Sequence, residues 1–262
     1  MGAPTKGSDM TTEYLNRNDA PDLAYEFLPK EHATFNVMFL GGFRSDMAGS
    51  KAEALAHHGP RGGYNFLRFD YRGHGSSAGQ FEDACISDWL QDARDASKLL
   101  PDLPTFLVGS SMGGYIAMLL AREKAHDYRG LIGIAAAPDF TERLMWSVFT
   151  AAQKRTLHEV GFIEIPTEYD PEPYRITWKL IEDGRQHLLL DRKIKLGMPC
   201  HFLQGERDED VPPSWPSRIA ATLEDEDVLV TMVKDGDHRL SRPQDISLLI
   251  GCLEHLRIKT GL

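Results

Sequence analysis

The sequence contains few cysteines, and their positions do not suit a disulfide framework or a zinc site. Cys85, Cys200 and Cys252 are odd in number and widely spaced, and no Cys-x-x-Cys pair occurs. This usage favours a reducing compartment. We therefore interpret all three as small buried apolar residues without a redox role.

Long apolar runs and an excess of cations are also missing. No apolar run approaches the roughly 18 residues of a membrane-spanning helix. The 29 Lys and Arg against 39 Asp and Glu give a formal net charge of −10. A surface of that sign repels phosphates, which argues against nucleic acid and against an anionic membrane as partners. The chain also lacks metal-ligand spacings, a P-loop and a Gly-x-Gly-x-x-Gly fingerprint, so we predict neither a metal nor a cofactor.

The remaining composition is that of a globular protein, with 42% hydrophobic and 26% charged residues. A chain of 262 residues suits one large domain, which we predict over residues 10–262. Residues 1–9 lack the pattern of a secretory signal, and we interpret them as a leader or a remnant of expression. A cytoplasmic location is therefore expected.

Short apolar runs bounded by turn residues alternate with helical patterns. The central strands are predicted over residues 34–40, 64–70, 105–109, 131–136, 200–204 and 228–233, and helices over 88–100, 112–126 and 246–258. Residues 13–15 and 23–27 are two further strands, expected as an antiparallel hairpin at one edge. This alternation predicts an α/β fold with a mostly parallel central sheet of about eight strands flanked by helices.

One segment interrupts the alternation. Residues 139–196 carry helical patterns, among them 174–190, and loops, but no clear strand. We predict a helical lid, inserted after the strand that follows the helix 112–126. Its aromatic residues offer an apolar acyl pocket lined by Trp146, Phe149, Tyr174 and Trp178; packing of the lid onto the core is the alternative.

The pentapeptide Gly109-Ser110-Ser111-Met112-Gly113 stands between a strand pattern and a helical one. Gly-x-Ser-x-Gly in this position is typical of a nucleophile elbow. The turn lifts the central hydroxyl above the sheet, beside a helix N-terminus whose N–H groups and dipole favour an oxyanion. We predict Ser111 as the nucleophile and Ser110 as a packed turn residue.

A serine nucleophile needs a base, and the base needs an acid that orients it. With this elbow, acid and histidine follow in chain order, each in a loop after a strand. Asp208 follows the strand 200–204 and precedes Val211-Pro212 by three residues, with Asp210 as the alternative acid. His238 follows the last predicted strand, and it alone among the ten histidines has this order and setting.

A second oxyanion donor is expected from the loop after strand 34–40. Gly41-Gly42 allow a close approach of the backbone to a substrate. We predict the N–H groups of Phe43 and Met112 as the two donors. A tight turn without chemistry is the alternative for this loop.

Residues 70–77 follow the pattern Asp-x-Arg-Gly-x-Gly-x-Ser, which recurs across α/β-hydrolases as a rigid turn beside the nucleophile. We interpret Arg72 and His74 within it as scaffold. With the elbow and the two loops of Asp208 and His238, this turn makes the chain resemble the α/β-hydrolase superfamily over roughly residues 20–260.

Several runs resemble more narrowly the palmitoyl-protein thioesterase and acyl-glucuronide esterase group typified by α/β-hydrolase domain-containing protein 10. These runs are 23–25, 42–43, 47–52, 109–114, 211–212, 237–240 and 245–246. The chain departs from that group in the doubled Gly41-Gly42 and in the lid. Because a mitochondrial leader is missing, the resemblance suggests a bacterial cytoplasmic relative.

The predicted function is hydrolysis of a carboxylic ester or thioester of a small acyl substrate, through a Ser-His-Asp triad and an acyl-enzyme, without a cofactor. Three alternatives use or adapt the same fold. A serine peptidase on short peptides would want an acidic anchor, for which Glu164, Glu168 and Glu172 of the lid are available. A cofactor-free perhydrolase or C–C hydrolase shares the triad. A non-catalytic hydrolase-like binding protein would lose catalytic residues, whereas all three residue types are present.

Overall fold

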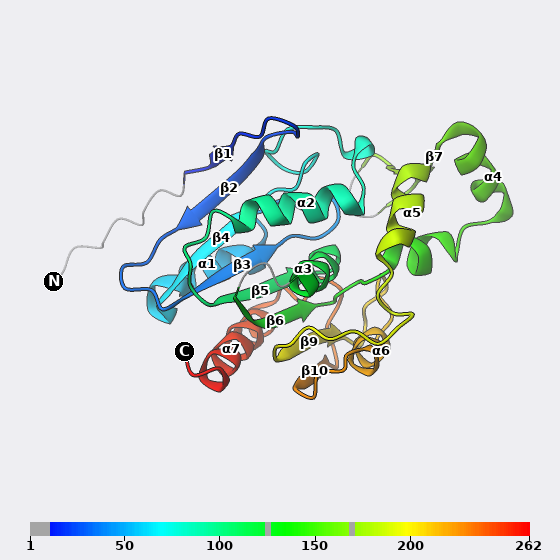
Figure 1. Cartoon of the computed structure of the whole chain (residues 1–262). Helices are drawn as coiled ribbons and strands as arrows, with labels where there is room; N and C mark the ends of the chain where they lie inside the picture. Colours follow the sequence, from blue (N-terminus) through cyan, green and yellow to red (C-terminus); the bar gives the residue numbers. More distant parts are fainter. Residues whose placement is uncertain (1–10, 124–126, 168–170) are drawn as a thin grey trace.

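The computed structural model describes residues 11–123, 127–167 and 171–262 and contains one eight-stranded sheet (Figure 1). Its strands, in spatial order, are β1 (Glu13–Leu15), β2 (Leu23–Leu28), β4 (Tyr64–Phe69), β3 (Phe35–Leu40), β5 (Thr105–Ser110), β6 (Tyr128–Ile134), β9 (Cys200–Gly205) and β10 (Val228–Val233). The β1–β2 and β2–β4 pairs are antiparallel and all other pairs are parallel. The predicted sheet and its edge hairpin are confirmed, whereas the predicted leader and the end of the predicted helix 112–126 lie outside the described residues.

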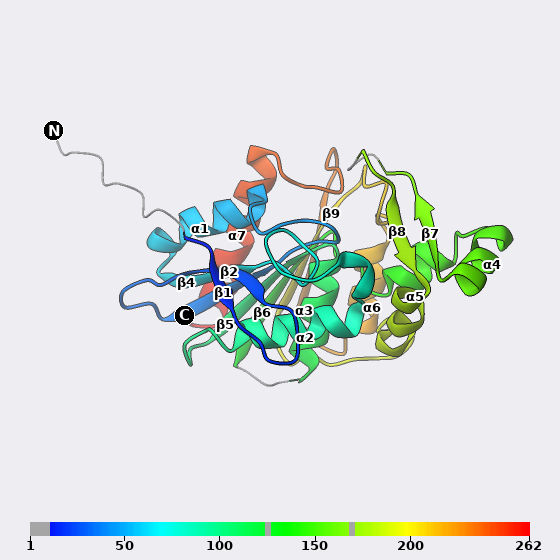
Figure 2. The same cartoon turned by 90° about the horizontal axis from the view of Figure 1, so that it is seen from above.

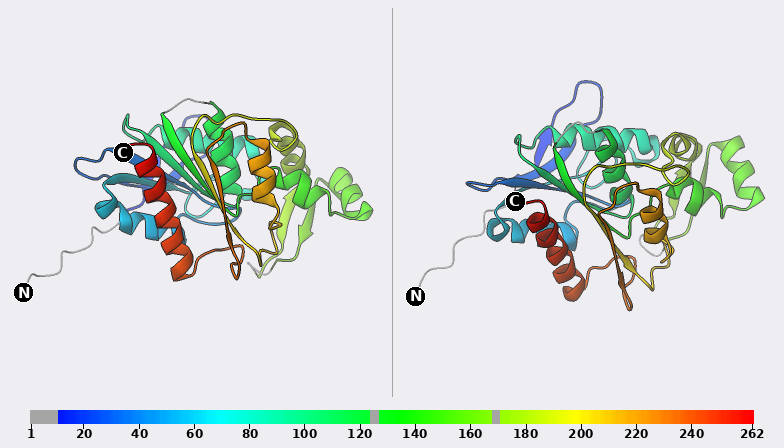
Figure 3. Two further views of the ribbon diagram at one scale, coloured as in Figure 1. Left: turned by 90° about the horizontal axis from the view of Figure 1, so that it is seen from below. Right: turned by 60° about the horizontal axis from the view of Figure 1, so that its bottom comes forward.

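Helices cover both faces of the sheet (Figure 2, Figure 3). The core on one face includes side chains of α2 (Ile86–Ser97), α3 (Met112–Glu123) and α6 (Trp215–Thr222). The core on the other face includes side chains of α1 (Ser50–Gly62) and α7 (Pro243–Lys259). Every residue of β3, β4 and β9 is buried, because these strands pack against helices on both sides. None of the helices in the described part of the chain has the length and apolar character that crossing a membrane requires.

The segment between β6 and β9 projects beyond one end of the sheet (Figure 1, Figure 2). It comprises a π-helical turn (Thr141–Trp146), α4 (Ala151–Val160), β7 (Phe162–Ile165), β8 (Tyr174–Thr177), α5 (Trp178–Gly184) and a 3₁₀ turn (Arg185–His187). The prediction of a purely helical segment is wrong, because β7 and β8 pair as an antiparallel hairpin. Each strand has only four residues, too few for a clear period in the sequence.

Buried polar contacts attach this segment to the sheet domain. Asp139 is fully buried, and its carboxylate accepts the N–H groups of Leu189 and Leu190 at 2.7 and 2.9 Å. Ser87 of α2 donates to Asp183 and contacts His187 Nε2, at 2.6 and 2.7 Å. The two ends of the segment are therefore joined to each other through Asp139, and the second end is held against α2 through Ser87.

A buried carboxylate organises the turn after β4. Asp92 of α2 is fully buried and accepts hydrogen bonds from the Arg72 guanidinium at 2.7 and 2.9 Å and from the Arg72 N–H at 2.8 Å. Arg17, also nearly buried, donates to the same carboxylate at 2.7 Å. Arg72 therefore joins the turn of residues 70–77 to α2, in line with its interpretation as scaffold.

We predict that Asp92→Asn lowers the free energy of unfolding by about 1–3 kcal/mol, because it removes the fully buried carboxylate that Arg72 and Arg17 share, while these keep Asp88 and Asp95 as ion-pair partners. Chemical denaturation measures this loss. The matched control is Glu123→Gln, which breaks the partly exposed pair with Arg94 and is expected to cost below about 1 kcal/mol. Equal losses in the two variants would contradict the special weight given to Asp92.

Candidate active site

Ser111 lies in a sharp turn between the last residue of β5 and the first residue of α3. Its backbone is left-handed, with φ of 54°, a conformation that non-glycine residues rarely adopt. Two flanking glycines make the turn sterically possible. A Cβ on Gly109 would stand 2.3 Å from the Gly113 carbonyl oxygen, and a Cβ on Gly113 would stand 2.0 Å from that of Leu40. The predicted elbow is therefore present as a strained and closely packed turn.

His238 and Asp208 lie in line with this serine. His238 Nε2 is 3.1 Å from Ser111 Oγ, and His238 Nδ1 is 2.9 Å from Asp208 Oδ2. His238 belongs to the loop between β10 and α7, and Asp208 to the loop after β9. The three side chains predicted as a triad are thus brought together by three separate loops at the carboxyl ends of parallel strands.

Asp208 has a buried side chain whose oxygens are satisfied by hydrogen bonds. Its Oδ1 accepts the N–H groups of Asp210 and Val211 at 2.9 and 2.8 Å, and its Oδ2 accepts from Gln204 Nε2 at 2.7 Å. Such contacts hold a carboxylate in one orientation. Asp210, the alternative acid, is exposed, and it is the carboxylate of Asp208 that contacts the imidazole. The role of Gln204 in holding Asp208 was not predicted, because a buried glutamine in a strand belongs to no recognisable motif.

These residues also raise the question of a metal ion. Among the described residues, Asp208, Asp210 and His238 bring ligand atoms within 4.8 Å of one another. However, both imidazole nitrogens and the Asp208 carboxylate already take part in hydrogen bonds with Ser111, Gln204 and each other. The arrangement therefore fits a proton relay to Ser111 better than a ligand set.

The predicted oxyanion donors flank Ser111. Met112 begins α3, and Phe43 stands in the loop after β3. Neither N–H has a hydrogen-bond partner within residues 11–123, 127–167 and 171–262. Gly42 brings the two loops together, since a Cβ at that position would lie 3.6 Å from Ser111 Cβ. Two free backbone donors beside a hydroxyl are the elements of an oxyanion hole.

Ser111 and His238 line a cleft of about 790 Å³. Its apolar lining includes side chains of the inserted segment, among them Phe140, Leu144, Met145, Phe149, Ile165 and Tyr174. Its polar lining includes Arg44, Asp46, Lys51, Arg239 and Ser241. Such a volume is ordinary for a small-molecule site.

The structure corrects half of the predicted acyl pocket. Phe149 and Tyr174 line the cleft, but Trp146 and Trp178 do not. The two indoles pack on each other with ring centroids 5.5 Å apart, and the His158 ring lies 4.0 Å from that of Trp178. Spacing in the sequence could not separate these roles, because all four residues are aromatic and lie in one segment.

Lys51, at the start of α1, reaches the loop that carries His238. Its ammonium donates to the Arg239 carbonyl oxygen and to Ser241 Oγ, the latter at 3.3 Å. Burial lowers the pKa of Lys51 to about 8, although the charges of Asp237 and Asp245 oppose this shift. The run 47–52, notable in the sequence only for its resemblance, thus contributes a contact that supports the histidine loop.

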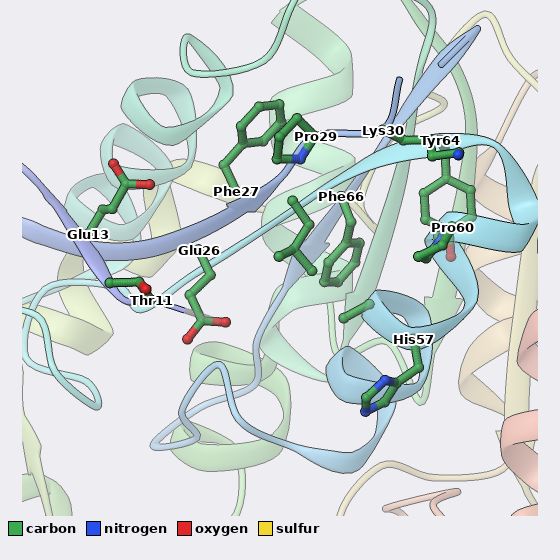
Figure 4. Close-up of a pocket in the computed structure, with 13 residues that line it drawn as sticks. Thr11, Glu13, Glu26, Phe27, Pro29, Lys30, His57, Pro60, Tyr64 and Phe66 are labelled. Carbon is green, nitrogen blue, oxygen red and sulfur yellow. The ribbon is translucent and has the colours of Figure 1, made fainter. Parts of the chain in front are cut away.

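The remaining reactive side chains lie elsewhere. All three cysteines are buried and unpaired, as predicted, and burial raises the pKa of the Cys85 thiol to about 12 and that of Cys252 to about 11. A second cavity of about 560 Å³ lies between the edge strands and α1 (Figure 4). Glu13, Glu26 and Tyr64 are among its lining residues, and it shares none with the cleft. The cleft is therefore the cavity onto which the predicted nucleophile and base, Ser111 and His238, open.

Comparison with known proteins agrees with this geometry. The Hydrolase_4 family model, described as serine aminopeptidase, S33, matches residues 33–164. The mouse "Palmitoyl-protein thioesterase ABHD10, mitochondrial" is 34% identical over 244 residues, which cover 93% of this chain and 81% of that protein.

Two solved structures are similar over nearly the whole chain. A putative hydrolase from Agrobacterium vitis S4 is 38% identical, with a TM-score of 0.89 and coverage of 95% of this chain and 99% of that one. Mouse alpha/beta hydrolase domain-containing protein 10 is 31% identical, with a TM-score of 0.86 and the same coverage. On sequence and fold together, the chain belongs to the α/β-hydrolase family, in the group of the palmitoyl-protein thioesterase ABHD10.

Proposed function

We propose that this protein is a serine hydrolase that cleaves carboxylic ester or thioester bonds of small acyl substrates. The observation that carries the proposal is the line of contacts from Ser111 Oγ through both imidazole nitrogens of His238 to Asp208, with steps of 3.1 and 2.9 Å. Relatives named as thioesterases support the same reaction class.

In the proposed mechanism, Ser111 Oγ attacks the acyl carbonyl while His238 Nε2 takes the hydroxyl proton. Asp208 accepts a hydrogen bond from Nδ1–H, so Nε2 keeps its lone pair free for the serine. The N–H groups of Phe43 and Met112 stabilise the tetrahedral oxyanion. His238 then protonates the departing alcohol or thiol, and a water activated by the same imidazole releases the acid from Ser111.

The apolar and the polar lining residues of the cleft suggest how a substrate is oriented. The apolar lining, with Phe149 and Tyr174, suits an acyl chain, because burial of its methylenes is favourable by about 0.8 kcal/mol each. The polar lining, with Lys51 and Ser241 beside the His238 loop, suits the alcohol or thiol portion, which must reach water after cleavage.

A peptidase remains the second candidate, because the matching family model is described as a serine aminopeptidase. Such an enzyme would need an acidic side chain to bind the substrate amine, and the predicted lid offers little support for one. Glu164 pairs with Arg175 at 3.1 Å, and Glu168 lies outside the described residues. Asp46 and Asp210 also line the cleft and offer carboxylates for a substrate amine.

A fluorophosphonate probe is expected to label the wild-type protein, because the probe reacts with activated serine hydroxyls. Ser111→Ala should abolish labelling, read by gel fluorescence and by mass spectrometry of the modified peptide. Ser110→Ala is the matched control and should still be labelled. Labelling that persists in Ser111→Ala would place the nucleophile elsewhere.

Asp208→Asn is expected to lower kcat by about 10,000-fold, because an amide at this position favours the wrong imidazole tautomer. Asp210→Asn, two residues away in the same loop, should stay within about tenfold of wild type, because the carboxylate that contacts the imidazole belongs to Asp208. Steady-state kinetics on a p-nitrophenyl ester measure both. A larger loss in Asp210→Asn would exchange the roles of the two acids.

Substrate class is tested by comparing p-nitrophenyl esters and acyl-CoA thioesters of graded chain length with aminoacyl amides. We expect esters or thioesters to be hydrolysed, with kcat/KM rising with acyl length until the apolar part of the cleft is filled. Phe149→Ala enlarges the cleft at this lining position and should shift the optimum to longer chains. Turnover confined to aminoacyl amides would replace the esterase proposal by the peptidase.

A further inference from the structure

A buried histidine lies directly behind the predicted oxyanion loop. His74 is 4% exposed and does not line the cleft. Its Nε2 contacts the backbone N–H of Arg44 at 3.1 Å, and its Nδ1 contacts the carbonyl oxygen of Arg72 at 3.2 Å. Arg44 immediately follows Phe43, whose N–H is one of the two proposed oxyanion donors.

Hydrogen-bond chemistry determines the protonation of this imidazole. A carbonyl oxygen can only accept, so Nδ1 must carry the proton. A backbone N–H can only donate, so Nε2 must carry a lone pair. The ring is therefore neutral, and burial together with the charge of Arg44 keeps the pKa of His74 low, at about 4. The acceptor for the Arg44 N–H is consequently available at neutral pH.

Two hydrogen-bonded peptide groups enclose Phe43. The Gly42 carbonyl oxygen accepts from Ser45 N–H at 3.2 Å and from Ser45 Oγ at 2.9 Å. Because a trans peptide directs its C=O and N–H in opposite directions, the Phe43 N–H points away from Ser45. The next peptide group is held through the Arg44 N–H by His74. Both dihedral angles of Phe43 are thereby constrained.

The backbone conformation of this loop is intrinsically unfavourable and needs support from its neighbours. Arg44 has φ of 55°, which is unfavourable for a side chain with a Cβ. The Phe43 ring packs edge-on against Phe81 and Trp89, at 4.9 and 5.8 Å, and the His74 ring packs against the same two rings at 5.2 and 5.4 Å. The histidine and the oxyanion loop therefore share one aromatic support.

Resting on the proposed function, we propose that His74 is a positioning residue: its neutral imidazole accepts the Arg44 N–H and so holds the Phe43 N–H in place for the oxyanion. The residue touches neither substrate nor Ser111. Its removal should weaken stabilisation of the tetrahedral intermediate while leaving ground-state substrate binding in the cleft largely intact, because the cleft walls are formed by other residues.

The test compares three substitutions at this position. Gln places an amide oxygen near the position of Nε2 and preserves the acceptor, whereas Asn reaches only to the position of Nδ1 and Leu offers none. Full loss of an oxyanion donor costs about 100- to 1,000-fold in kcat, so a displaced donor should cost about 10- to 100-fold. We expect that loss in kcat, with little change in KM, for His74→Leu and His74→Asn, and near wild-type kcat for His74→Gln.

A second measurement separates positioning from folding. Affinity for a trifluoromethyl ketone, which forms a tetrahedral adduct on a serine, should fall with kcat across the series, while affinity for the product acid stays constant. Tyr71→Phe is the matched control: it removes a buried hydroxyl that has no hydrogen-bond partner among the described residues, 5.7 Å between ring centroids from His74. It should leave kcat unchanged.

The possible outcomes are distinguishable. If His74→Leu does not fold, the contrast between Asn and Gln carries the test. Two results would show that the positioning role is wrong, provided that wild type hydrolyses esters. One is an unchanged kcat in His74→Asn, and the other is a kcat loss in His74→Gln as large as that in His74→Asn. If wild type hydrolyses no ester or thioester, the proposed function fails instead, whatever the His74 variants do.

Discussion

The close contact between the start of α3 and the end of β3 is the constraint on which the rest of the site depends. Gly113 lies so near the Leu40 carbonyl oxygen that even a methyl group would overlap it. This approach places the loop of Phe43 beside the strained turn of Ser111. The Ser111 hydroxyl and the two backbone N–H groups proposed as oxyanion donors, which follow two different strands, thereby lie close together.

Around that point, three buried polar side chains are held by hydrogen bonds. Asp208 has four hydrogen-bonding neighbours, including His238, and its carboxylate is therefore held in one orientation. Asp92 is similarly satisfied behind the turn of residues 70–77. His74 in the same turn is kept neutral by burial. A site that must stabilise developing charge benefits from neighbours whose own charges are already fixed.

Much of the fold was predictable because its signals are local. Buried parallel strands appear as continuous apolar runs, and their alternation with helices predicts a mostly parallel sheet covered on both faces. α1 and α6 were not predicted: α1 carries Pro60 within its span, and α6 has only eight residues. The β7–β8 hairpin was missed because each strand has only four residues. Whether so short a segment forms a strand depends on the strand it pairs with, and the residues of one segment alone do not show this.

By itself, the sequence determined the order Ser111, Asp208, His238 and the loops that carry them, because a tight elbow demands glycines and each loop follows a recognisable strand. Only the tertiary structure decided which carboxylate meets the imidazole, which aromatic residues of the inserted segment face the cleft, and that His74 contacts the oxyanion loop. These features depend on distances between segments far apart in the chain. Such distances are set by packing and not by local residue pattern.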